Sequence, residues 1–113
     1  MKTIIDDEIK GLTTTAYVKV CTFNIARVNG LTFIIRNRGA VSTLKYKLLA
    51  YANKNTVDID DAVEYVSETE LAISSNHEEV VSKTPYVKAE LYVKSGTGKT
   101  EFSITATKQM QEQ

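Results

Sequence analysis

The sequence predicts an all-β fold, an antiparallel β-sandwich of Ig-like or jelly-roll-like form with about six to seven strands. Apolar and polar residues alternate with a period of two over most of the chain, which is typical of strands with one buried face. Turn residues interrupt this alternation at short intervals, and no segment has the 3.6-residue period of a long helix. The 113 residues are enough for one core. We divide them into an N-terminal arm at 1–12, a single sandwich domain at 13–108 and a C-terminal tail at 109–113.

The first strand region of the predicted sandwich covers residues 13–28. Its apolar residues are even-numbered up to Val20 and odd-numbered from Cys21 onward. A pleated strand changes its buried face only at a bulge or where it passes from one sheet to the other. We therefore expect one of these two features between Val20 and Cys21.

Two pairs of alternating segments predict β-hairpins. Residues 31–36 and 44–51 lie on either side of the turn-forming sequence Asn37-Arg38-Gly39. Residues 86–94 and 101–107 lie on either side of a turn rich in Ser and Gly. The outer face of the first pair also carries apolar residues, which indicates that it is partly covered: Ile34, Leu49 and Tyr51.

The segment between these pairs allows more than one interpretation. Residues 58–66 predict either one helical turn or a polar loop with an edge strand. Residues 69–74 predict another strand, with Leu71 and Ile73 inward, and residues 75–79 predict a turn. The expected core consists of the apolar residues on the buried faces of the strands: Val18, Phe33, Ile35, Leu44, Leu48, Val87, Leu91, Val93, Phe102 and Ile104.

The composition indicates a globular protein that does not enter a membrane. No stretch approaches the roughly 20 apolar residues of a membrane-spanning helix. The start has no apolar run after Lys2, so we expect no signal peptide and a protein made in a cytoplasm. Cys21 is the only cysteine, which excludes an intramolecular disulfide and indicates a buried structural thiol.

The charges cancel over the whole chain, but they are segregated along it. Eight basic residues and no acid lie between Lys10 and Lys54, and eight acids and no base lie between Asp58 and Glu79. Two outcomes are open: the two runs pair within one subunit, or the basic face of one subunit meets the acidic face of another. The candidate interface residues are Arg36, Arg38, Lys45, Lys47, Asp58, Asp60, Asp61 and Glu64.

Three local motifs are typical of ligand sites, and each departs from its pattern. Gly98-Lys99-Thr100 matches the end of a phosphate-binding loop, but Val93 replaces the first glycine and the following residues alternate as a strand. The acids from Asp58 to Asp61 lack the glycine and the terminal glutamate of a calcium loop. His77 has no second His or Cys near it in the sequence for a zinc site. We therefore expect no enzyme activity, no metal and no cofactor.

Nucleic acid is not among the partners that we expect. The four basic candidate residues could cluster across one hairpin, and three tyrosines (Tyr17, Tyr46 and Tyr51) could stack on bases. The sequence pI is about 6.6, however, whereas strong nucleic-acid binders usually carry a net positive charge. Solvated strand faces account for most of the lysines.

The segments 31–39 and 44–51 form an apolar strand that ends in Asn-x-Gly and then a Tyr-Lys-apolar strand. They resemble a pattern of small β-sandwich proteins from the particles of tailed phages and prophages, as do residues 84–96. The resemblance implies a non-catalytic virion subunit of the head-decoration or connector type, assembled in the host cytoplasm. Its expected partners are copies of itself and a major capsid or other virion protein. Two alternatives stay open, an Ig-like cell-surface binding module and a small phage-encoded inhibitor or regulator of a host protein.

Overall fold

The fold is all-β, as the alternation predicts. The computed structural model describes residues 2–5, 9–25, 28–52, 62–82 and 86–110. Within these ranges there are nine strands and no helix: β1 (Lys2–Ile5), β2 (Ile9–Leu12), β3 (Val18–Asn24), β4 (Val28–Asn37), β5 (Leu44–Tyr51), β6 (Val63–Leu71), β7 (Asn76–Ser82), β8 (Lys88–Ser95) and β9 (Glu101–Met110).

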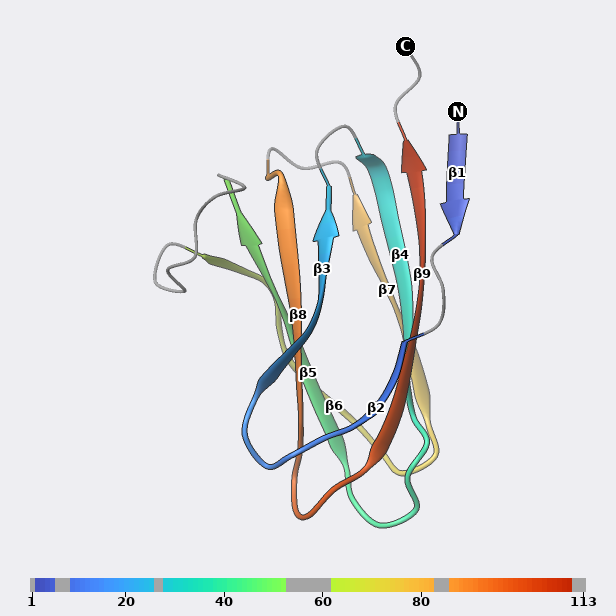
Figure 1. Ribbon diagram of the computed structural model, residues 1–113, viewed down its shortest axis with the longest axis vertical. Coiled ribbons are helices and arrows are strands. Elements are labelled where there is room, and N and C mark those ends of the chain that lie inside the picture. Colours follow the sequence, from blue (N-terminus) through green and yellow to red (C-terminus); the bar gives the residue numbers. More distant parts are fainter. Residues whose placement is uncertain (1, 6–8, 26–27, 53–61, 83–85, 111–113) are drawn as a thin grey trace.

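The strands form two antiparallel sheets that face each other (Figure 1). Sheet A has the order β1-β9-β4-β7, and β2 also pairs with β9, beyond the end of β1. Sheet B has the order β3-β8-β5-β6. The two sheets enclose the apolar core between them, so the molecule is the predicted β-sandwich.

The pairing of the strands is nested. β5 pairs with β6, β4 with β7, β3 with β8 and β2 with β9. Successive pairs alternate between sheet B and sheet A, as in a long two-stranded ribbon that is rolled up. This is the topology of a jelly roll, which was one of the two predicted forms, and not that of an Ig-like sandwich.

The two predicted hairpins are wrong in their pairing. β4 and β5 lie in different sheets, and so do β8 and β9. Each turn therefore carries the chain across the sandwich from one sheet to the other. Alternation fixes which residues of a strand face the core, but a strand in either sheet satisfies the same pattern, so alternation does not select the partner strand.

The N-terminal part of the chain contributes strands to sheet A. The segment expected as an arm includes β1 and β2, which both pair with β9. The expected change of face in the first strand region is a bulge, because the register of β3 against β8 shifts between Lys19 and Cys21. After the bulge Phe23 and Ile25 are buried as predicted, whereas Val18 before it is 49% exposed, so its predicted place in the core is wrong.

The segment between the predicted pairs contains an edge strand and a short turn. Residues 63–66 belong to β6, so the edge-strand alternative is confirmed there, while residues 58–61 lie outside the described part. β6 ends at Leu71, and Ile73 is exposed in the turn that follows, contrary to its predicted inward position. The predicted turn at 75–79 is wrong as well, because β7 begins at Asn76.

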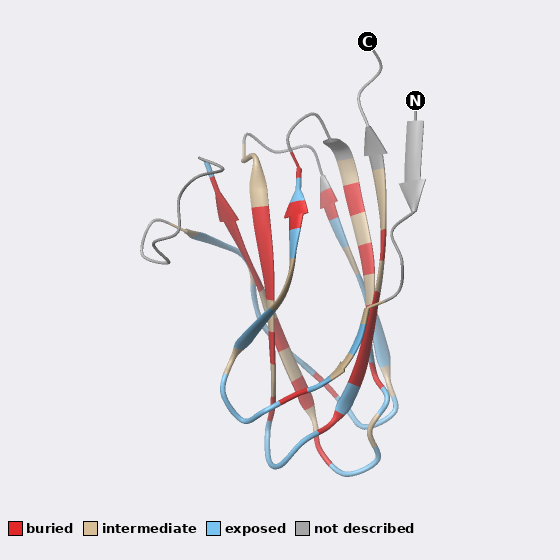
Figure 2. Cartoon of the chain, in the orientation of Figure 1, coloured by how far each residue is buried: buried red, intermediate tan, exposed pale blue. Residues whose placement is uncertain are grey.

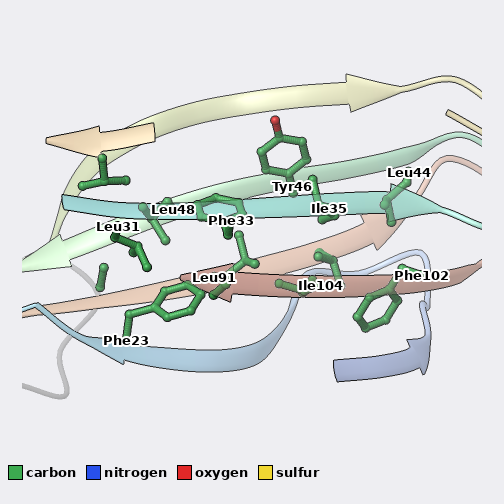
Figure 3. Packing of buried hydrophobic residues seen from close by; sticks show 14 of the residues in the cluster. Phe23, Leu31, Phe33, Ile35, Leu44, Tyr46, Leu48, Leu91, Phe102 and Ile104 are labelled. Atoms are coloured by element: carbon green, nitrogen blue, oxygen red, sulfur yellow. The ribbon is translucent and has the colours of Figure 1, made fainter. Parts of the chain in front are cut away.

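The core otherwise follows the alternation (Figures 2 and 3). Eight of the ten predicted members are buried, and Val87 is half-buried. Leu49 and Tyr51 are buried on the outer face of β5, which confirms that this face is partly covered. Cys21 is half-buried and packs against the core; with Phe23 and Ile104 it lines a cavity of about 220 Å³ between β3 and β9.

Candidate assembly surfaces

The four basic candidate residues lie on opposite sides of the sandwich. Arg36 is on β4 in sheet A, and Arg38 is the first residue of the loop that follows this strand. Lys45 and Lys47 lie on the outer face of β5 in sheet B. Both arginines are exposed, and both lysines are half-buried. The four residues therefore do not form one cluster across a hairpin.

The one acidic candidate that the structure describes, Glu64, lies on the strand that neighbours the strand of the two lysines. Glu64 is exposed on β6, the neighbour of β5 in sheet B. The other three acidic candidates lie outside the described residues: Asp58, Asp60 and Asp61. β6 also carries Glu70, which pairs in register with Lys45. Residues of the two charged runs, Lys45 and Glu70, are therefore neighbours on this face.

A tyrosine spans the outer face of sheet B. Tyr17 lies just before β3, and its hydroxyl donates a hydrogen bond to Glu68 on β6, at the opposite edge of the sheet. The ammonium groups of Lys47 and Lys94 lie 4.4 and 4.6 Å from the centre of the Tyr17 ring. Lys94 also forms an ion pair with Glu68 at 3.5 Å. These contacts place Lys47 and Lys94 in interactions within one subunit.

Glu90 is the centre of a second group on the same face. Its Oε1 accepts a hydrogen bond from the Tyr92 hydroxyl at 3.0 Å. Its Oε2 lies 3.4 Å from Lys19 Nζ and 3.8 Å from Lys88 Nζ. Lys88 Nζ is also 4.5 Å from the centre of the Tyr51 ring. Because this carboxylate is buried, its contacts count for more than exposed ion pairs do.

Replacing Glu90 by glutamine should lower the free energy of unfolding at neutral pH. It should also make the free energy of unfolding depend less on pH in the acid range. Burial acts to raise the pKa of Glu90, but hydrogen bonds with Tyr51 and Tyr92 and the charge of Lys19 outweigh it and leave the pKa lowered. A carboxyl whose pKa is lower in the folded state stabilises the fold above its unfolded pKa, about 4.3. That contribution is lost as the pH falls through the folded value. Glu90→Gln should therefore lower the free energy of unfolding by about 1–3 kcal/mol at pH 7, with a smaller difference in acid.

Urea unfolding from neutral pH to about pH 3 measures this effect across the range in which carboxyls titrate. Glu101→Gln is the matched control, because Glu101 is exposed at the start of β9. If the wild-type chain and Glu90→Gln lose stability in parallel as the pH falls, Glu90 does not carry the proposed contribution.

His77 lies on β7 and not in a turn. Its Nε2 is 3.1 Å from Glu79 Oε1, and its ring is 6.4 Å from the ring of Tyr46, measured between centres. The Tyr46 hydroxyl is buried and has no hydrogen bond of ordinary geometry among the described residues. Burial and, to a lesser extent, Glu79 raise the pKa of Tyr46. Within the same part of the chain, no three His, Cys, Asp or Glu side chains gather as metal ligands.

Four loops meet at one end of the sandwich, and hydrogen bonds join them. Thr13 N donates to the carbonyl of Thr100, and Thr100 N donates to Thr13 Oγ1, both at 3.0 Å. Thr97 N donates to Ser42 Oγ at 3.1 Å. The loops lie at the lower end of Figure 1 and comprise residues 12–16, 38–43, 72–75 and 95–100.

Asn37, the last residue of β4, is the centre of this network. It is 2% exposed. Its Nδ2 donates to the carbonyl oxygens of Ser42 at 2.9 Å and Ala72 at 3.2 Å. Its Oδ1 accepts from Gly39 N at 3.1 Å and from the Thr100 hydroxyl at 2.7 Å. One side chain thus binds three of the four loops, which gives the Asn-x-Gly sequence a structural role.

The four loops carry apolar side chains, and their own charged residues are basic, although the exposed Glu101 directly follows the last loop and lines a pocket with Arg38 and Leu12. Leu12 and Ile73 are exposed, and Val41 is 83% exposed. The charged residues of the loops are Arg38 and Lys99, with no Asp or Glu among them. We call this surface the basic pole. Arg38 is the only one of the predicted interface residues in it.

The two edge strands β6 and β7 form a surface of opposite charge. They are the last strands of sheet B and sheet A, and the turn at 72–75 joins them. From Val63 to Val81 the described chain has five glutamates and no lysine or arginine. Val63 and Tyr65 are exposed on β6, and Val80 is 64% exposed on β7. We call this surface, which includes the candidate Glu64, the acidic flank.

Sequence reasoning named Arg38 and Glu64 as interface residues of these surfaces, but not Lys99 or the exposed apolar residues. Of the seven large hydrophobic residues exposed in the described part of the chain, three lie on the basic pole and three on the acidic flank. Only the seventh, Val18, lies elsewhere, on β3. The apolar residues of the basic pole are isolated in sequence and give no periodic signal, so they are recognised only when the fold brings the loops together. Those of the acidic flank lie on β6 and β7, where an exposed apolar residue is not distinguished from a core residue by sequence.

Comparison with known proteins identifies the fold. No protein-family model matches the chain, and no curated protein matches it. A chain from the Bacillus endospore appendages, which form a family of disulfide-linked pili, is similar in structure with a TM-score of 0.54 and 14% identity. The match covers 96% of the present chain and 88% of the appendage chain.

A chain of infectious bursal disease virus, Gt strain, is also similar, with a TM-score of 0.50 and 10% identity. It is matched over 96% of the present chain, which spans 33% of the viral chain. At these identities the likeness defines the class of fold, a jelly-roll β-sandwich that occurs in a pilus and in a virus. Neither similar protein is named as coming from a tailed phage. No helix long and apolar enough to cross a membrane occurs in the described residues.

Proposed function

We propose that the chain is a non-enzymatic structural subunit that acts by binding copies of itself and other proteins of a particle. More specifically, we propose that the particle is that of a tailed phage or prophage. The chain is then a head-decoration or connector-type subunit, assembled in the host cytoplasm. A major capsid or other virion protein is then its second partner.

The exposed apolar residues of the basic pole are the observation that carries the proposal. They lie on loops that a buried hydrogen-bond network holds together through Asn37. A surface that is ordered before binding loses little conformational entropy when a partner docks. A fold alone does not imply a function, but the two similar chains come from a pilus and from a virus, which are both assemblies of many subunits.

The Ig-like cell-surface module is weakened as an alternative, because the nested pairing is that of a jelly roll. A subunit of an extracellular filament takes its place as the second candidate. The similarity to the spore-appendage chain favours it, since that match covers 88% of the appendage chain.

Electron microscopy and mass spectrometry of particles from the source cells test the proposal. Phage particles should contain peptides of this chain in many copies, and particles from cells that lack its gene should lack the corresponding density. Peptides found only in cell-surface filaments would favour the second candidate. If the chain is in neither type of assembly, the structural role is wrong.

A further inference from the structure

We propose that the basic pole of one copy docks on the acidic flank of a second copy, so that the copies join end to side. This inference rests on the proposed function, because it names the two surfaces through which the subunit binds itself. The contact is heterologous: each copy offers a pole to one neighbour and a flank to another. Such contacts build rings if they close and filaments if they do not.

Charge complementarity is the first argument. The four loops of the basic pole carry Arg38 and Lys99 and no acid. β6 and β7 carry five glutamates and no lysine or arginine. Two of the five already have partners in the same chain, since Glu68 is paired with Lys94 and Glu79 with His77. Glu64 and Glu78 are exposed on this flank. A pole that faced another pole, or a flank that faced another flank, would bring like charges together, whereas a pole on a flank brings opposite charges together.

The positions of the exposed apolar residues are the second argument. An interface needs apolar side chains at its centre and charged residues around them. Both surfaces supply exposed aliphatic residues, with Val41 on the pole and Val80 on the flank as the most exposed of each set. The other three strands of sheet B expose one large apolar residue, Val18, among the described residues. The lysines on their outer face contact glutamates and tyrosines of the same chain.

The edges of the sheets favour a contact through side chains over the addition of one strand to another. Proteins protect sheet edges with bulges and with charged residues that point inward. β6 has two register shifts against β5, and β3 has one against β8. On β7, His77 and Glu79 lie opposite the buried residues Ile35 and Phe33, and so on the core side of the strand. Each of these features works against regular pairing with a second chain.

Paired surface variants of the full chain test the proposal. The pole variant combines Val41→Glu with Lys99→Glu, and the flank variant combines Glu78→Lys with Val80→Lys. Sedimentation velocity of each should show self-association weakened at least about tenfold. An equimolar mixture should form a one-to-one dimer and nothing larger, because each variant retains the surface that the other has lost. Wild-type self-association should also weaken as salt is added.

The controls separate this proposal from the proposed function. Val18→Glu and Val18→Lys change an exposed valine outside both surfaces and should assemble like the wild-type chain. Circular dichroism checks that the variants fold, and Lys99→Glu alone replaces the pole variant if that variant does not. If the wild-type chain assembles but both variants assemble equally well, or if their mixture stays monomeric, the pole-to-flank contact is wrong and the structural role stands. A wild-type chain that never self-associates would overturn both.

Discussion

Replacing Asn37 by alanine should lower the free energy of unfolding by about 3–4 kcal/mol. The substitution removes a side chain that bonds three of the four loops at the basic pole. It leaves the Thr100 hydroxyl and the carbonyl of Ser42 without their partners at a buried position. Each buried polar group that loses its partner costs about 1–3 kcal/mol. Urea unfolding at pH 7 measures the change.

Two further substitutions make this test specific to the network. Asn76→Ala removes an exposed asparagine at the start of β7 and should change stability by less than about 0.5 kcal/mol. Gly39→Ala should destabilise the chain although it removes no hydrogen-bonding group, because a Cβ at this position would overlap the Thr100 hydroxyl. A loss for Asn37→Ala no larger than that for Asn76→Ala would contradict the role of Asn37 as the centre of the network.

Replacing Leu91 by alanine should lower the free energy of unfolding by about 2–5 kcal/mol. Leu91 is fully buried on β8, where it belongs to the core cluster between the sheets (Figure 3). The cost has two parts, the lost burial of the side chain and the cavity that the surrounding residues cannot fill. Chemical denaturation with tyrosine fluorescence or circular dichroism as the signal measures it.

The same substitution at an exposed leucine is the matched control. Leu12→Ala, at the end of β2 on the basic pole, should change stability by less than about 0.5 kcal/mol. The difference between the two variants then reports burial alone, because the side-chain atoms removed are identical. Equal effects at Leu91 and Leu12 would mean that the inward face of β8 is wrongly assigned.

The sequence was sufficient to predict the fold class and most of the core. Period-two alternation located most of the strands and eight of the ten expected core residues, because the face of a pleated strand is a local property. It missed β1 and β2, which were expected as an arm, and the start of β7, which was expected as a turn. The change of parity between Val20 and Cys21 even located a bulge. Strand partners were not predictable in this way. Whether β4 pairs with β5 or crosses to the other sheet depends on contacts that are distant in the sequence.

The candidate surfaces were predictable only in part, for a similar reason. The charge runs were visible in the sequence, but the fold distributes them over several faces. Lys45 and Lys47 belong to the outer face of sheet B, whereas Arg38 joins Lys99 at the basic pole, more than half the chain length away in sequence. The apolar residues of the pole come from three separate loops. They become one surface only through the hydrogen bonds that join those loops.

The self-association of the purified wild-type chain is the most direct test of the structural role. Sedimentation velocity over a wide range of protein concentrations measures the mass of the species in solution. The average mass should rise above the 12.6 kDa of one chain as the concentration increases, and added salt should lower it, because exposed charge pairs are screened over about 8–10 Å. A single species of 12.6 kDa at every concentration and salt level would contradict the claim that this chain builds assemblies from copies of itself.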